Sequence, residues 1–108
     1  MFEVSNPAPR TFGLRGELDM ETARLLLDVV RPVLDEPGDV VLDLRDLAFM
    51  DSYGIHAMLK IAEPLVGGSL VLEGPQPIVE RALQIKGVGA QPNIRLLRDQ
   101  MWLAQGTG

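Results

Sequence analysis

The segment that most restricts the fold of this chain is a short apolar run, Val40-Val41-Leu42-Asp43-Leu44. Its β-branched and leucine side chains are typical of a strand. Only one of its residues is polar, which is typical of a strand buried on both faces of a sheet. Such strands pair in parallel, and parallel neighbours need long crossovers that are usually helical. We therefore expect this strand inside a layered α/β fold.

Segments before and after this strand have the apolar spacing of amphipathic helices. The first follows Asp19, whose carboxylate suits an N-cap, and its predicted buried stripe is Met20, Ala23, Leu27, Val30 and Leu34. Pro32 removes a helical N–H, so we expect a kink or an end near Arg31. The second begins at Ser52 and buries Ile55, Met58, Leu59, Ala62 and Leu65. The third has Pro77 in its first turn and a stripe of Ile78, Val79, Ala82, Leu83 and Lys86.

Four further segments have strand patterns, of which 11–18 is the clearest because its apolar residues alternate. The others are 2–5, which ends at the break Asn6-Pro7-Ala8-Pro9, and then 69–73 and 93–97. We predict a connection over 46–50 and a short helix or frayed end over 98–104. The order gives an α/β class with a mixed sheet of four to five strands, antiparallel at its start, and helices mainly on one face. We expect one domain over 1–108, with its core in about 2–100 and a frayed 101–108.

Composition excludes several classes of function. Hydrophobic residues make up 46% of the 108 residues, which is enough for a packed core. The net charge of -5 argues against nucleic acid or an anionic membrane as a partner. Without cysteine there is no disulfide, thiolate catalysis or cysteine zinc site. The chain shows neither a signal peptide nor a membrane-spanning stretch, so we expect a cytoplasmic protein.

Sites for catalysis, metals or cofactors are not expected. His56 is the single histidine and shares a predicted helix face with Lys60, so it fits a solvated surface better than a metal site. Asp39, Asp43, Asp46 and Asp51 leave a Mg²⁺ site open, but acidic residues around a strand usually cap turns. Gly87-Val88-Gly89 lacks the third glycine of a dinucleotide loop, and no nucleophile elbow is present. A receiver domain phosphorylated on Asp43 or Asp46 would need a lysine after the last strand, and 93–97 has none.

The segment Phe49-Met50-Asp51-Ser52-Tyr53-Gly54 is the remaining candidate site. It joins the end of the buried strand to the start of the second helix, the edge where α/β sheets usually meet ligands and partners. Either Asp51 or Ser52 fits the N-cap of that helix. A phosphoryl group on Ser52 would also suit a helix N-terminus, so capping and modification are compatible.

Two motifs together resemble the STAS domain, and most closely the bacterial anti-sigma factor antagonists of the sporulation type. The first is Gly16-Glu17-Leu18-Asp19. The second is Val41-Leu42-Asp43-Leu44 with Asp46-Leu47-Ala48-Phe49-Met50-Asp51-Ser52-Tyr53-Gly54. The ending Leu83-Gln84-Ile85-Lys86-Gly87-Val88 resembles that of the third helix in the family, and the resemblance covers about residues 2–100.

The resemblance implies a function that composition does not show. Such a protein binds an anti-sigma factor that is also a serine/threonine kinase of the GHKL type, and binding frees the sigma factor. The kinase phosphorylates the serine that matches Ser52, which breaks the complex, and a serine phosphatase resets it. Partner contacts are then expected at Asp19, Met20, Glu21, Asp51, Ser52, Tyr53, Gly54 and His56.

This chain departs from the family at two positions near that serine. Tyr53 stands where a second Ser or Thr is usual, and His56 replaces a small residue. An alternative is a STAS subunit of another assembly, either a lipid-transport ATPase complex or a stress-sensing scaffold. In such an assembly Ser52 would remain unmodified and only cap the helix.

Overall fold

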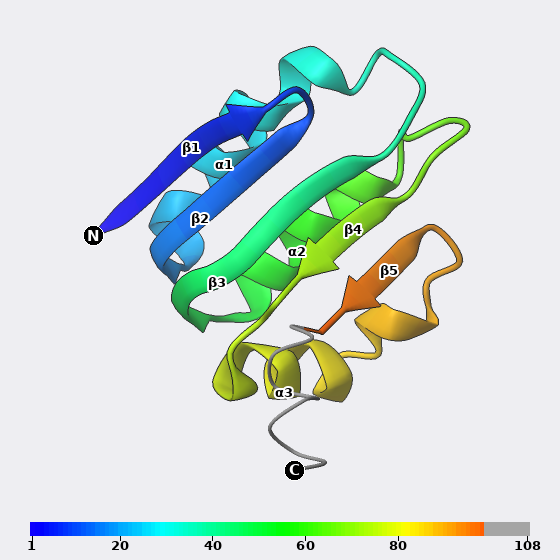
Figure 1. The fold of residues 1–108 in the computed structure, drawn as a ribbon. Coiled ribbons are helices and arrows are strands. Elements are labelled where there is room, and N and C mark those ends of the chain that lie inside the picture. The colour runs from blue at the N-terminus through cyan, green and yellow to red at the C-terminus, as the bar shows by residue number, and fades with distance from the viewer. Residues whose placement is uncertain (99–108) are drawn as a thin grey trace, which may run out of the picture.

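The structure is a computed structural model and describes residues 1–98 (Figure 1). Its strands are β1 (Phe2–Ala8), β2 (Thr11–Leu18), β3 (Val40–Met50), β4 (Leu70–Glu73) and β5 (Ile94–Leu97). Its helices are α1 (Met20–Val30), α2 (Ser52–Ala62) and α3 (Pro77–Ile85), with 3-10 turns at Arg31–Val33 and Val88–Ala90. The expectations for 99–104 and 101–108 fall outside the described residues.

The five strands form one mixed sheet in the order β1-β2-β3-β4-β5. β1 and β2 pair antiparallel, and the other three pairs are parallel. Figure 1 shows α1 and α2 together behind one face of this sheet. The predicted α/β class, the antiparallel start and the helices mainly on one face are confirmed.

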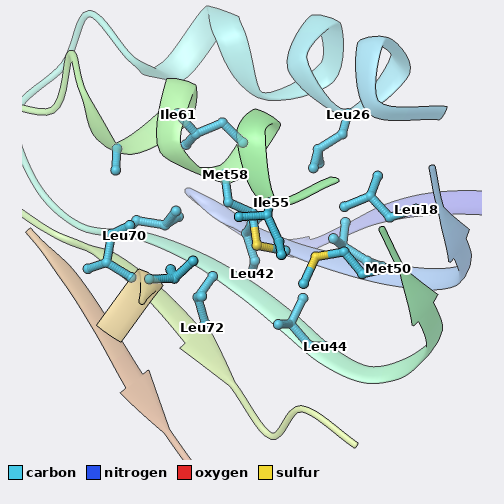
Figure 2. Packing of buried hydrophobic residues seen from close by; sticks show 14 of the residues in the cluster. Leu18, Leu26, Leu42, Leu44, Met50, Ile55, Met58, Ile61, Leu70 and Leu72 are labelled. Atoms are coloured by element: carbon cyan, nitrogen blue, oxygen red, sulfur yellow. The ribbon is translucent and has the colours of Figure 1, made fainter. Parts of the chain in front are cut away.

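The hydrophobic core lies between the sheet and the helices (Figure 2). Leu42 and Leu44 of β3 are fully buried there, beside Leu72 of β4 and Met58 of α2. Burial alternates along the start of β3, because Val41 and Asp43 are only half-buried. The expectation that this strand is buried on both faces was wrong, since the helices cover one face of the sheet.

β3 is longer than the sequence indicated. It continues through Asp46 to Met50, where we predicted a connection. Its pairing with β2 shifts register twice, between Gly13 and Arg15 and between Gly16 and Glu17. Irregular pairing removes the strict alternation of buried and exposed side chains. The pattern of this segment therefore did not predict a strand.

β1 also continues beyond its predicted end at Ser5. It reaches Ala8 after an irregularity in its pairing with β2. A proline is tolerated at 7 because β1 is an edge strand, where the missing N–H breaks no internal ladder. The Asn6 Nδ2 donates to the carbonyl oxygens of Ala8 and Thr11, at 2.8 and 2.7 Å, which closes the turn to β2.

The helix limits were predicted better than the buried stripes. α1 ends at Val30, and Pro32 lies in the 3-10 turn that follows. Met20 is 62% exposed although its stripe was expected to be buried, and Leu26 is buried in α1 instead. In α3 the predicted stripe was wrong for Ile78 and Lys86, which are both exposed. The buried residues of α3 are Val79 and Leu83.

Candidate functional site

The first turns of α1 and α2 lie next to each other at one edge of the sheet. Leu18 ends β2 and Met50 ends β3, and the two residues are paired in the parallel register. The backbone N–H of Asp51 then donates to the carbonyl oxygen of Leu18 at 3.1 Å. Each strand passes directly into its helix, so Asp19 and Asp51 occupy equivalent positions side by side.

Asp19 is the N-cap of α1, as predicted. Its Oδ1 accepts hydrogen bonds from the backbone N–H groups of Glu21 and Thr22, at 3.0 and 3.1 Å. The Thr22 hydroxyl oxygen accepts from the Asp19 N–H at 2.9 Å, which completes a capping box. The hydrogen bond from the Thr22 backbone N–H is the main reason why the pKa of Asp19 lies below its usual value.

Asp51, and not Ser52, is the N-cap of α2. Its Oδ1 accepts from the backbone N–H groups of Tyr53 and Gly54, at 2.9 and 3.2 Å. Ser52 is the first helical residue and its side chain is exposed. Its hydroxyl makes no hydrogen bond with any described residue. The two alternatives left open by the sequence are thereby separated: Asp51 caps the helix and the Ser52 hydroxyl is free.

Two glycines of the motifs are required by close packing at this edge. A Cβ on Gly54 would lie 2.6 Å from Cγ of Met50 and 2.9 Å from Cγ of Leu18, so only glycine lets α2 start against these buried side chains. Gly16 has a φ of +99°, and a Cβ there would overlap the Met1 carbonyl oxygen. That oxygen accepts from the Glu17 N–H, so β1 needs the close approach.

The other predicted contact residues lie on the surface around these two helix starts. Met20 and Glu21 are exposed in the first turn of α1, and Tyr53 is exposed in the first turn of α2. His56 is also exposed, four residues after Ser52, which places the two side chains on one face of α2. Gly54 is buried and contributes only backbone to this surface.

Exposed large apolar side chains gather at the same edge. Met20 and Tyr53 have been placed there, and Phe49 precedes the turn into α2. Leu97 is the last residue of β5, and its carbonyl oxygen accepts a hydrogen bond from the Gly74 N–H. Ile78 lies in the first turn of α3. This edge of the sheet therefore carries several exposed apolar side chains.

A shallow groove of about 200 Å³ opens beside Ser52, between the first turn of α2 and α3. It is called the α2–α3 groove below, and its lining consists of Met50, Asp51, Ser52, Ile55, Ala82, Ile85 and Lys86. The sequence reasoning missed its α3 side. Ile78 and Ile85 are seven residues apart, out of phase with the buried pair Val79 and Leu83. That second apolar phase was the available signal.

Two larger hollows lie elsewhere. One, of about 260 Å³, is on the sheet face beside Glu3, Arg15, Asp43 and Asp46, and the other, of about 490 Å³, is near Asn93. Asp43 is hydrogen-bonded and ion-paired to Arg45, and Asp39 accepts from the Ser69 N–H. Within residues 1–98 no three acidic or histidine side chains come close enough to hold a metal ion. None of the described helices has the length and apolar composition to cross a membrane.

Comparison with known proteins places these features in a family. The profile of the STAS domain matches residues 3–100. An anti-sigma factor antagonist from Mycobacterium paratuberculosis is 22% identical with a TM-score of 0.73, over 88% of this chain and 84% of that chain. The unphosphorylated anti-sigma factor antagonist SpoIIAA is 23% identical with a TM-score of 0.70, over 100% and 97%. The phosphorylated form of the Bacillus cell fate determinant SpoIIAA is 22% identical with a TM-score of 0.63, over 97% and 98%. At these identities the solved structures show a shared fold.

Proposed function

Because the chain belongs to the STAS domain family, we propose that it acts as an anti-sigma factor antagonist in the cytoplasm. Its partner in this proposal is an anti-sigma factor of the GHKL serine/threonine kinase type, which it binds through the edge formed by the starts of α1 and α2. The kinase switches it off by phosphorylating Ser52, and a serine phosphatase switches it on again. The chain itself binds and does not catalyse.

The freedom of Ser52 is the observation that carries this proposal. Gly16 and Gly54 are needed for packing, and Asp19 and Asp51 cap the two helices. Ser52 is exposed, and no packing or hydrogen bond in the described residues depends on its side chain. A residue that the fold does not use is well placed for a role at the surface.

The shape of the edge favours a protein partner over a small molecule. The α2–α3 groove of about 200 Å³ is open, whereas small-molecule sites are usually enclosed and hold about 300–1,000 Å³. The surrounding surface carries exposed apolar side chains, such as Met20, Phe49 and Tyr53, and exposed polar residues, such as Glu21 and Ser52. Protein interfaces are built in this way.

Phosphorylation at this position would act on the interface and leave the fold in place. The phosphoryl group adds about -1.5 to -2 charges at a helix N-terminus, which accommodates anions. The same charge would enter the interface without a matching group on the partner, and this can cost several kcal/mol. Solved structures of SpoIIAA in an unphosphorylated and a phosphorylated form support this proposal, since both share the fold of this chain.

The test uses purified GHKL-type anti-sigma kinases encoded in the same genome as this chain. Each kinase is incubated with the chain and labelled ATP, and the phosphorylated residue is mapped by mass spectrometry. We expect phosphate on Ser52, and none on the Ser52→Ala variant, which should still bind the kinase. Phosphate on Tyr53 or Ser69 would contradict the proposed switch. Absence of binding to every kinase, with co-purification of a transporter ATPase, would instead favour the alternative STAS assembly.

A further inference from the structure

Lys86 supplies to the α2–α3 groove a positive charge that has no ion-pair partner among residues 1–98. It follows the last residue of α3 and is exposed, and it lines the groove together with Ser52. No carboxylate of the described residues forms an ion pair with it, whereas Arg10, Arg31, Arg45 and Arg98 are all paired. Among the described residues of the lining, the other charged one is Asp51, whose Oδ1 already accepts from two N–H groups of α2.

The remaining lining is apolar and has a strongly exposed rim. Met50, Ile55 and Ala82 form its inner part. Ile85 lies at the rim of the groove and is 71% exposed. Ile78 lies two turns earlier on the same side of α3 and is 59% exposed. An apolar groove with a lysine at one end is complementary to an apolar side chain followed by a carboxylate.

We propose that Lys86 and the α2–α3 groove bind an acidic, apolar segment of the protein partner, and that phosphate on Ser52 releases the segment by taking Lys86 as its own counter-ion. The identity of the partner rests on the function proposed above. The pairing of Lys86 with the phosphate does not, because it occurs within this chain.

The release follows from competition for one charge. In the unmodified protein Lys86 is available to a carboxylate of the partner. After phosphorylation the groove contains a group of about -1.5 to -2 charges, which pairs with Lys86 and repels that carboxylate. Asp51, Tyr53 and His56 are titratable side chains near Ser52 on α2, and Asp19 and Glu21 lie at the neighbouring start of α1.

The counter-ion is tested on the full chain with phosphoserine incorporated at 52. The second ionisation of the phosphate is followed by ³¹P NMR, with and without Lys86→Gln, in a His56→Gln background so that the one histidine on the Ser52 face of α2 does not contribute. A nearby ammonium group favours the dianion, so Lys86→Gln should raise the phosphate pKa by about half a unit. The control Lys60→Gln removes an exposed lysine further along α2 and should change nothing. Equal pKa values with and without Lys86 would overturn the pairing.

Docking is tested with the GHKL-type kinase that binds the unmodified chain. Lys86→Gln and Ile85→Glu should each weaken binding about tenfold or more, while Lys60→Gln and Val66→Glu should not. Val66 is a matched control because it is 75% exposed in the loop after α2, outside the groove. Unchanged affinity in both groove variants would overturn the docking site. If no kinase binds the wild type, the proposed function and the docking site both fail, and the ³¹P titration alone decides the pairing of Lys86.

Discussion

The backbone N–H of Asp51 donates a hydrogen bond of 3.1 Å to the carbonyl oxygen of Leu18. This bond fastens the last residue of β2 to the residue that caps α2. Because Asp19 directly follows Leu18, two segments more than thirty residues apart in sequence meet at one point of the surface. The arrangement of this edge therefore rests on a backbone contact and does not depend on the Ser52 side chain, which stays available for the proposed switch.

Substitution of Gly54 by alanine should destabilise the protein. The added Cβ would lie 2.6 Å from Cγ of Met50, so the start of α2 or the Met50 side chain must move. Overpacking of this kind costs about 1–3 kcal/mol, measured as the free energy of unfolding in urea. Gly89→Ala is the control because a Cβ added there would meet no atom within 4 Å, and it should be neutral to within about 0.5 kcal/mol. Equal losses in the two variants would contradict the packing described here.

The core assignment of β3 predicts large effects from Leu42→Ala and Leu44→Ala. Both side chains are fully buried between the sheet and the helices. Each truncation should lower the free energy of unfolding by about 2–5 kcal/mol. Val66→Ala, at a position that is 75% exposed, should lose less than about 0.5 kcal/mol. A loss of that small size in both leucine variants would refute their burial.

The lowered pKa of Asp19 predicts how the stability of the protein depends on pH. Its pKa in the folded protein is lowered, chiefly by the Thr22 backbone N–H, so the ionised form stabilises the fold. This stabilisation is fully present above the unfolded-state pKa of about 3.9 and is lost as the pH falls through the folded value. Asp19→Asn still caps the helix but does not titrate. The urea midpoint of the wild type minus that of Asp19→Asn should stay constant from pH 7 to 5. This difference should fall below about pH 4, because the wild type loses the stabilisation by its ionised cap. A constant difference down to pH 2 would contradict the ionised cap.

The charge at 52 should control partner binding without changing the fold. Ser52→Asp should weaken kinase binding by about 4 kcal/mol, or about 10³-fold, because an anion that the partner does not match enters the interface. Ser52→Asn has the same shape without the charge and should bind at least tenfold more tightly than Ser52→Asp. Circular dichroism spectra of both variants should match that of the wild type. An aspartate variant that binds as tightly as wild type would remove Ser52 from the interface.

Asp19→Ala tests whether the start of α1 shares the partner surface. Since Asp51 is hydrogen-bonded next to it through Leu18, the alanine variant should weaken kinase binding about tenfold in a calorimetric titration. Asp35→Ala is the control, because Asp35 is exposed and lies after the 3-10 turn that follows α1, beyond the C-terminal end of that helix. Equal affinities for the two variants would exclude Asp19 from the surface.

The sequence predicted those parts of the fold that depend on local chemistry. Asp19, Pro32 and Pro77 mark helix limits through their own side chains or rings, and the structure has these limits as expected. The alternation in Thr11–Leu18 predicted β2 for the same local reason. Both helix starts of the candidate site, including the exposed Ser52, could therefore be located before the structure was known.

Features that depend on distant neighbours could not be predicted in this way. The continuation of β3 to Met50 involves two register shifts in its pairing with β2, and those shifts leave no period in the sequence of β3. Ile78 and Ile85 are apolar and lie on one face of α3, as buried residues would, but both are exposed. Their exposure depends on where α3 lies relative to α2. The groove beside Ser52 was missed because it is formed by that tertiary arrangement.

Asp51 caps α2 and Ser52 does not, and this difference has a genetic consequence. Asp51 performs the capping, so most small polar substitutions at 52 should leave the amount of folded protein in the cell unchanged. Mutations that abolish the proposed switch would then be fully expressed alleles that remain permanently active or permanently silent. A search for loss of expression would miss them, whereas a search for altered signalling output would find them at this single codon.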